Sequence, residues 1–174
     1  MNRMWAPWRK TYLRSSSSKR SGCLFCRLLG DKKDKRNLIL FRTSHYAVIL
    51  NRYPYNNGHL MIVSKRHIAC LSQLNDPEKA EFFEVLEKTR VVLLKAMKPQ
   101  GFNVGMNISD IAGAGIADHL HWHIVPRWKG DVNFMPVLTG TKVISESLES
   151  AYEVLSSALA QTTGRILRKN APQK

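Results

Sequence analysis

Three histidines alternate with apolar residues over residues 118–128, which read DHLHWHIVPRW. Side chains on a β-strand point alternately to its two faces, so we expect His119, His121 and His123 to share one face. The apolar residues between them then pack on the core from the other face. Imidazole can act as a nucleophile, a proton carrier or a metal ligand near pH 7, so this row predicts a chemical site.

Spacing alone leaves two kinds of site open. In the first, the three imidazoles are ligands of zinc or copper in a metalloenzyme. In the second, one imidazole is a covalent nucleophile, and its neighbours orient it and handle the charge that develops.

The segment before this strand has the composition of a phosphate-binding loop. Residues 112–115 read AGAG, and Asn107 precedes them. Glycines let backbone amides approach an anion closely, and a run of such amides can hold a phosphate. Beyond the strand, Arg127 and Lys129 add positive charge where a polyphosphate could extend.

The chain has three cysteines, which is an odd number and argues against a disulfide framework. Cys23 and Cys26 have the spacing of a zinc half-site, with a redox dithiol as the alternative. Because no second Cys-x-x-Cys follows, a zinc site needs histidines, and His67 after a predicted strand is available. Cys70 has no evident partner, and we expect it to be a small buried apolar residue.

Short strands and two helices are expected to position these residues. The predicted strands are 38–41, 45–50, 59–63, 102–108 and 119–125, and the predicted helices are 79–97, capped near Asn75, and 145–160. Residues 54–58 (PYNNG) form a strong turn signal before the third strand. This order predicts an α+β fold with a mostly antiparallel sheet. A Rossmann unit is disfavoured, because no Gly-x-Gly-x-x-Gly joins a strand to a helix.

The length of 174 residues predicts one catalytic domain, over 23–165, between a basic arm (1–22) and a basic tail (166–174). Residues 1–40 hold eleven Lys or Arg and two acidic residues, within a net charge of +14. Such an arm either attracts polyphosphates and nucleic acid or is simply solvated. We expect a cytoplasmic protein without a membrane partner, because no apolar run approaches the roughly 18 residues that span a bilayer.

Residues 119–125 match the signature His-φ-His-φ-His-φ-φ, where φ is apolar, and so resemble the histidine-triad (HIT) family of nucleotide-binding enzymes. Residues 50–60 (LNRYPYNNGHL) resemble the nucleoside-binding segment of that family. Residues 4–9 (MWAPWR) and 126–134 (PRWKGDVNF) resemble the branch that contains diadenosine tetraphosphate phosphorylases. The resemblance implies a half-barrel antiparallel sheet with a long helix packed across it, a C-terminal helix and a homodimer.

The resemblance also implies roles for individual residues. His121 would attack the α-phosphorus, His123 would contact the phosphate, and His59 would lie beside the nucleophile. The implied nucleotide contacts are Asn51 to the ribose, and Asn107 with the backbone of Gly113, Ala114, Gly115 and Ile116 to the phosphates. Many family members have Gln where this chain has Gly115, six residues before the nucleophile, so here the backbone would have to replace that amide.

In zinc-bearing relatives a Cys-x-x-Cys pair, a His after a strand and the first triad His bind the metal. The matching residues are Cys23, Cys26, His67 and His119, which implies a closed structural zinc site. The implied substrate is an adenine nucleotide or dinucleoside polyphosphate, cleaved through a covalent nucleotidyl-His121. Water as acceptor gives a hydrolase, and inorganic phosphate gives a phosphorylase. The alternative is a zinc-containing protein that binds nucleic acid or removes adenylate from its ends, which the lack of aromatic-basic stacking motifs disfavours.

Overall fold

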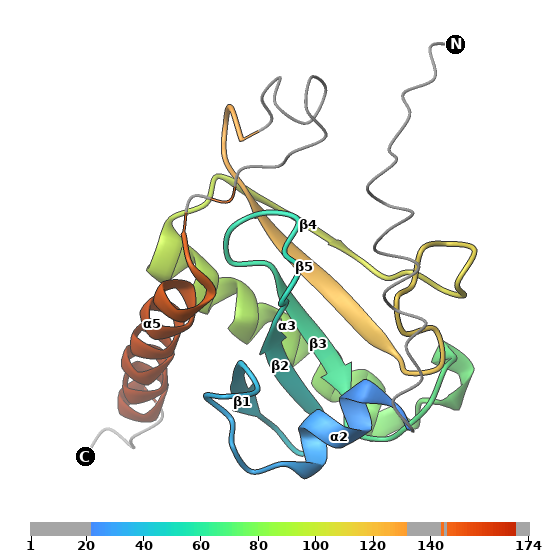
Figure 1. The fold of residues 1–174 in the computed structure, drawn as a ribbon. Helices are drawn as coiled ribbons and strands as arrows, with labels where there is room; N and C mark the ends of the chain where they lie inside the picture. Colours follow the sequence, from blue (N-terminus) through green and yellow to red (C-terminus); the bar gives the residue numbers. More distant parts are fainter. Residues whose placement is uncertain (1–21, 132–143, 145, 170–174) are drawn as a thin grey trace, which may run out of the picture.

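The computed structural model describes residues 22–131, 144 and 146–169 (Figure 1). Five strands form one antiparallel sheet in the order β1-β2-β3-β5-β4. The strands are β1 Ile39–Arg42, β2 Tyr46–Leu50, β3 Leu60–Ser64, β4 Gly101–Gly105 and β5 His121–Arg127. The helices are α2 Leu24–Gly30, α3 Asp76–Met97 and α5 Leu148–Lys169, with a short 3-10 helix η1 at Leu71–Gln73. The predicted α+β fold with an antiparallel sheet is confirmed.

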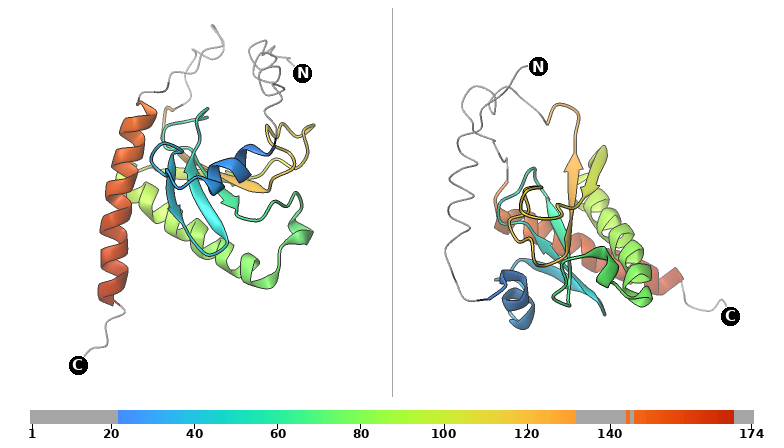
Figure 2. Two further views of the ribbon diagram at one scale, coloured as in Figure 1. Left: turned by 60° about the horizontal axis from the view of Figure 1, so that its bottom comes forward. Right: turned by 90° about the vertical axis from the view of Figure 1, so that its right-hand side faces the viewer.

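The two faces of the sheet carry different elements (Figure 2). Helices α3 and α5 cover one face and pack against alternate β2 side chains, which are Tyr46, Val48 and Leu50. The intervening β2 residues, Ala47 and Ile49, pack with Phe25 of α2 on the opposite face. Strand β5 follows the same alternation, with Trp122 and Ile124 in the helix-covered core. His121 and His123 therefore project toward the face that carries α2.

Helix α3 begins where the sequence predicts. The Asn75 side chain accepts from the Glu78 amide, and the Glu78 carboxylate accepts from the Asn75 amide. This reciprocal capping box satisfies two donors that a helix start otherwise leaves unpaired. The helix ends before Pro99 with Lys98 in the left-handed conformation.

The predicted turn over residues 54–58 joins β2 to β3. It contacts α3 through Gly58 and β5 through Asn56. Gly58 has a φ of +69°, and a Cβ on it would lie 2.5 Å from the Met97 sulfur of α3. Only glycine combines that conformation with such a close approach. Asn56 is buried, and its amide donates to the Pro126 carbonyl at 3.1 Å. The next residue after the turn, His59, is thereby held against β5.

Some predicted boundaries are wrong. Strand β5 begins at His121 rather than at residue 119, so His119 does not share the strand face of the other two histidines. The reason is tertiary: Leu120 donates its amide to the Ile68 carbonyl, and the His119 ring turns toward the end of β3. Strand β4 ends at Gly105, three residues earlier than expected.

Helix α5 runs to Lys169, well past the predicted end at residue 160. Its contact face continues through Ala158 and Thr162, which are both buried. The expectation for Cys70 is also wrong, because this cysteine is exposed. It precedes η1 as its N-cap, at the surface, rather than entering the core. None of the helices in the described ranges is long and apolar enough to cross a membrane.

Candidate functional site

His121 is held in one tautomer by the backbone. Its Nδ1 lies 2.7 Å from the carbonyl oxygen of His119, and a carbonyl can only accept, so Nδ1 carries the proton. The lone pair of the neutral ring is then on Nε2. The ring is 6 % exposed and packs against Phe25, with the ring centroids 5.0 Å apart. Burial lowers its pKa, so the ring is neutral near pH 7 and available as a nucleophile.

His123 and His59 form a second pair on the same face. The Nε2 atom of His59 lies 2.9 Å from Nδ1 of His123, and His59 is fully buried. Burial, with the neighbouring His121, lowers the pKa of His123 to about 4. The resemblance noted above implies that His59 lies beside the nucleophile, and in the structure its direct imidazole partner is His123.

Tyr55 is a site residue that the sequence analysis missed. Its ring lies over both members of this pair, with centroids 4.5 Å from His59 and 5.7 Å from His123. The ring is half exposed, so it forms part of the solvent-facing wall. The only sequence signal was its place in the turn segment beside His59.

Asn51, the predicted ribose contact, lies at the base of the same turn. Its Oδ1 accepts from the Tyr53 amide at 3.0 Å, and its Nδ2 lies 3.3 Å from Nδ1 of His59. The structure therefore brings Asn51 to the histidine pair, at the end of β2.

The glycine-containing loop before β5 is folded back on itself. The amides of Gly113 and Ala114 donate to the carbonyls of Asp110 and Ser109, and Asn107 donates to the Gly113 carbonyl at 3.4 Å. Three of the predicted phosphate donors, Asn107 and the amides of Gly113 and Ala114, are thus used inside the loop. Within the described part of the chain, the amides of Gly115 and Ile116 make no such internal bond. Among the predicted phosphate donors of this loop, only these two amides are not used in such a bond.

The four predicted metal ligands come together. One ligand atom each from Cys23, Cys26, His67 and His119 lies within 4.8 Å of the others. Nδ1 of His119 is 3.2 Å from the Cys23 sulfur and 3.2 Å from Nδ1 of His67. Two thiolates and two imidazoles are a set that suits tetrahedral zinc. No other group of three or more metal-ligating side chains occurs in the described residues, so a metal bound by the three triad rings is not supported.

The orientation of the His119 ring fits a ligand role. Its Nε2 lies 2.7 Å from the carbonyl of Ser64, at the end of β3, so Nε2 carries the proton. Nδ1, which faces the thiols, then has the free lone pair. Metal-binding histidines are commonly oriented in this way by a hydrogen bond from the other ring nitrogen.

His67 follows β3 in a segment held by an ion pair between buried Glu78 and half-exposed Arg66. Glu78 is 2 % exposed and accepts from Nε of Arg66 at 2.6 Å and from its Nη2 at 2.8 Å. Arg66 also donates to the Gln73 carbonyl. This contact between the residue before His67 and the start of α3 was not foreseen from the sequence.

Arg127 differs from its expected role. Instead of reaching toward a polyphosphate, its guanidinium pairs with Asp131 at 2.7 and 2.9 Å and donates to Asn103. Asp131 also accepts from Asn56, so the network joins the end of β5 to the turn before His59.

Comparison with known proteins agrees with this geometry. The HIT domain model matches residues 32–130. The AP-4-A phosphorylase of Mycobacterium tuberculosis is 36 % identical over 167 residues, which cover 92 % of this chain and 86 % of that protein.

Two solved structures share the fold. A hypothetical histidine triad nucleotide-binding protein from Sulfolobus tokodaii is 26 % identical, with a TM-score of 0.66 over 87 % of this chain and 99 % of its own. A Zn-bound histidine triad family protein from Mycobacterium smegmatis is 23 % identical, with a TM-score of 0.66 over 86 % of this chain and 99 % of its own.

Proposed function

This chain belongs to the histidine-triad family, and from that premise we propose that it cleaves dinucleoside polyphosphates through a covalent nucleotidyl-His121 intermediate. The observation that carries the proposal is the hydrogen bond from Nδ1 of His121 to the His119 carbonyl, which leaves a lone pair on Nε2 of a buried neutral ring. A surface histidine has no such fixed tautomer.

The proposed reaction has two displacements at phosphorus. Nε2 of His121 attacks the α-phosphorus, a P–N bond forms, and the P–O bond to the leaving phosphate chain breaks with its electron pair. The imidazole becomes cationic, and the His119 carbonyl on Nδ1–H stabilises it. An acceptor oxygen then attacks phosphorus and breaks the P–N bond, which restores neutral His121. Positioning and charge stabilisation supply the acceleration.

We assign the acceptor as inorganic phosphate and the substrate as a diadenosine polyphosphate. The support is the likeness to the mycobacterial AP-4-A phosphorylase, which extends over most of both chains. Within the site, His123 contacts the phosphates, Asn51 the ribose, and Asn107 shapes the loop formed by Gly113 and Ala114. The amides of Gly115 and Ile116 hold the phosphates, since the side chain found here in many relatives is absent.

The decisive experiment compares the unchanged protein, His121→Ala and His45→Ala on diadenosine tetraphosphate, with and without phosphate. His45 is a matched control, because it lies on the β1–β2 turn and faces Glu81. ADP and ATP formed only with phosphate, and lost by at least about 1,000-fold in His121→Ala, support the proposal. AMP and ATP formed without phosphate indicate a hydrolase instead.

Full activity of His121→Ala would contradict the proposed covalent mechanism. No turnover of any dinucleoside polyphosphate by the unchanged protein would remove the substrate class. Tight binding of adenylated nucleic-acid ends with adenylate release would then favour the nucleic-acid alternative.

For the metal centre we propose structural zinc on Cys23, Cys26, His67 and His119. The donor set fits, because the free lone pair of His119 faces both thiols and His67. Bound zinc would supply a cross-link rather than a reacting group, since all four tetrahedral positions are filled by protein.

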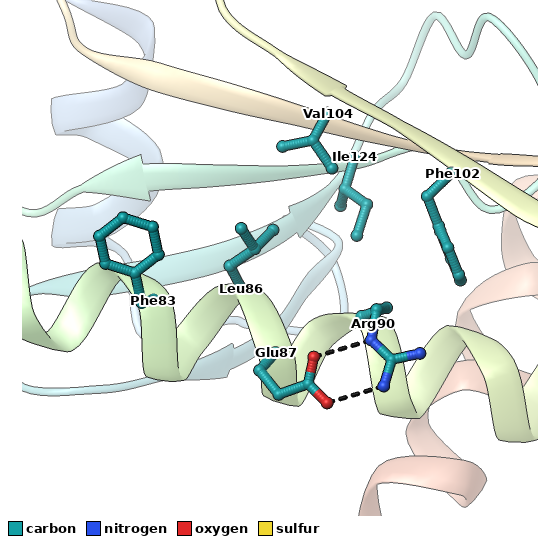
Figure 3. Close-up of a pocket in the computed structure, with 7 residues that line it drawn as sticks. All are labelled: Phe83, Leu86, Glu87, Arg90, Phe102, Val104 and Ile124. Atoms are coloured by element: carbon teal, nitrogen blue, oxygen red, sulfur yellow. Dashed lines mark hydrogen bonds and ion pairs between the residues drawn. The ribbon is translucent and has the colours of Figure 1, made fainter.

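We also propose that the chain is a homodimer, joined through the groove between β4 and α3 (Figure 3). Strand β4 is an edge of the sheet, and Val104 on it is 48 % exposed. Phe83 on α3 is 70 % exposed beside it, and Figure 3 shows both side chains along the same groove. Within the described part of the chain no further strand pairs with β4, and an edge strand next to large exposed apolar side chains is a surface that proteins usually bury.

The catalytic unit is proposed to be residues 23–165, with the arm (1–22) and the tail (166–174) outside it. All of the arm except Gly22 lies outside the described residues, and α5 continues across the boundary at 165.

A further inference from the structure

The backbone fixes which ring nitrogen of His59 accepts a hydrogen bond and which one donates. The amide of Tyr55 lies 3.0 Å from Nδ1 of His59, and a backbone N–H can only donate. Nδ1 of His59 is therefore an acceptor without a proton. The Nδ2 group of Asn51, 3.3 Å away, is a second donor toward the same atom.

The position of the proton on His59 determines which nitrogen of His123 is protonated. A neutral His59 with an unprotonated Nδ1 carries its proton on Nε2, which lies 2.9 Å from Nδ1 of His123. Nδ1 of His123 must therefore accept, and the proton of the neutral His123 ring is on Nε2. A second proton on His123 would place two N–H groups against each other, in agreement with its lowered pKa.

We propose that His59 is a positioning residue that fixes His123 as a hydrogen-bond donor, through Nε2–H, to the phosphate oxygens of the bound substrate. The role rests on the proposed function, because it requires a phosphate beside His123. His59 itself touches no reacting atom. It acts by excluding the tautomer in which His123 would present a lone pair to a phosphate oxygen and repel it.

The surroundings support this role over one of simple packing. His59 is fully buried, so water cannot exchange with Tyr55 or His123 as its partner. The turn that supplies the Tyr55 amide is anchored to β5 by Asn56 and to α3 by Gly58. Such an arrangement is pre-organised, and pre-organised donors are what stabilise charge that develops in a transition state.

The first test reads the tautomer directly in protein with no ligand added. Two-bond proton–nitrogen correlation spectra of ¹⁵N-histidine-labelled protein distinguish a protonated from an unprotonated ring nitrogen. We expect His123 to be protonated on Nε2 in the unchanged protein and in His59→Gln. The Gln side chain can still accept from Tyr55 through its oxygen and donate to His123 through its nitrogen. In His59→Glu, a carboxylate only accepts, so the proton of His123 should move to Nδ1.

The second test measures kcat and KM separately for diadenosine tetraphosphate. His59→Gln should keep kcat within about tenfold, whereas His59→Leu, which cannot donate, should lower it by about 100-fold with KM changed much less. A residue with only a packing role would give the opposite order, because Leu fills an apolar space better than Gln. Circular dichroism and thermal unfolding confirm that each variant is folded.

Protonation of Nδ1 of His123 in the unchanged protein overturns the proposal, as does equal kcat for the Gln and Leu variants. The tautomer spectrum needs no substrate. A protein with the expected tautomer but no turnover of dinucleoside polyphosphates would therefore contradict the proposed function and not the assignment of His59.

Discussion

His119 joins the candidate metal centre to the candidate nucleophile within one residue. Its ring offers Nδ1 to the cysteine thiols, and its backbone carbonyl accepts from Nδ1 of His121. The ring is in turn oriented by the carbonyl of Ser64. The two adjacent candidate sites thus share one residue, His119, which contributes its ring to one site and its carbonyl to the other.

Glu78 allows a test of pH dependence at the residue scale. The Arg66 guanidinium lowers the pKa of the Glu78 carboxyl from 4.5 to about 2, with help from the Asn75 amide. A lowered carboxyl pKa stabilises the fold above pH 4.5, and that contribution is lost as the pH falls toward 2. At pH 7 we expect Glu78→Gln to lower the free energy of unfolding by about 1–2 kcal/mol, a modest value because solvent screens the half-exposed Arg66 side of the ion pair.

The measurement is urea unfolding of metal-free protein at pH 7 and at pH 3. The difference in unfolding free energy between the unchanged protein and Glu78→Gln should be smaller at pH 3. Glu153→Gln is the control, on α5, since Glu153 and its partner Lys35 are both exposed. Its effect should stay below about 0.5 kcal/mol. A loss in Glu78→Gln that does not depend on pH would contradict the assignment.

At the scale of elements, the turn between β2 and β3 does more than connect two strands. It supplies the Tyr55 amide to His59, and Asn56 links it to Asp131 and hence to Arg127 of β5. The pairing of β3 with β5 sets Met61 opposite His123, which places the whole turn at the histidine face.

The β4–α3 groove gives a prediction at the same scale. Val104→Lys puts a charge on the exposed edge strand, so it should shift a dimer to monomer in sedimentation velocity while the monomer stays folded. Val154→Lys is the control, because this residue is 39 % exposed on α5, away from the groove. A monomeric unchanged protein, or dissociation by the α5 variant alone, would rule out this interface.

At the scale of the molecule, the four-residue cluster ties together three distant parts of the chain. Cys23 and Cys26 lie at α2, His67 follows β3, and His119 precedes β5. A metal bound there stabilises only the folded chain, by about 4 kcal/mol at a thousand-fold excess over its dissociation constant.

We therefore expect one zinc ion per chain by elemental analysis and a lower melting temperature after chelation. Cys26→Ser should lose the zinc and the stabilisation, whereas Cys70→Ser, which changes the exposed cysteine outside the cluster, should keep both. Turnover after chelation should fall only as far as the protein unfolds. Immediate and complete loss of turnover in folded protein would favour a catalytic metal instead.

The sequence by itself determined the features that depend on neighbouring residues. Alternation placed Trp122 and Ile124 in the core and His121 and His123 on the opposite face, because strand geometry has a period of two. The sequence also predicted the N-cap of α3 at Asn75 and the turn that ends at Gly58. Both depend on a few consecutive residues, because capping and turn conformations are local. The family followed from ordered motifs spread over most of the chain.

Tertiary structure alone decided which partner each functional side chain has. The His119 ring is oriented by the carbonyl of Ser64, 55 residues away, and the direct partner of the His123 ring is His59, 64 residues away. The guanidinium of Arg127 pairs with Asp131 instead of pointing toward a polyphosphate ligand. No local pattern encodes such contacts, because they arise only when the sheet brings distant strand ends together and burial makes an unpaired polar group costly.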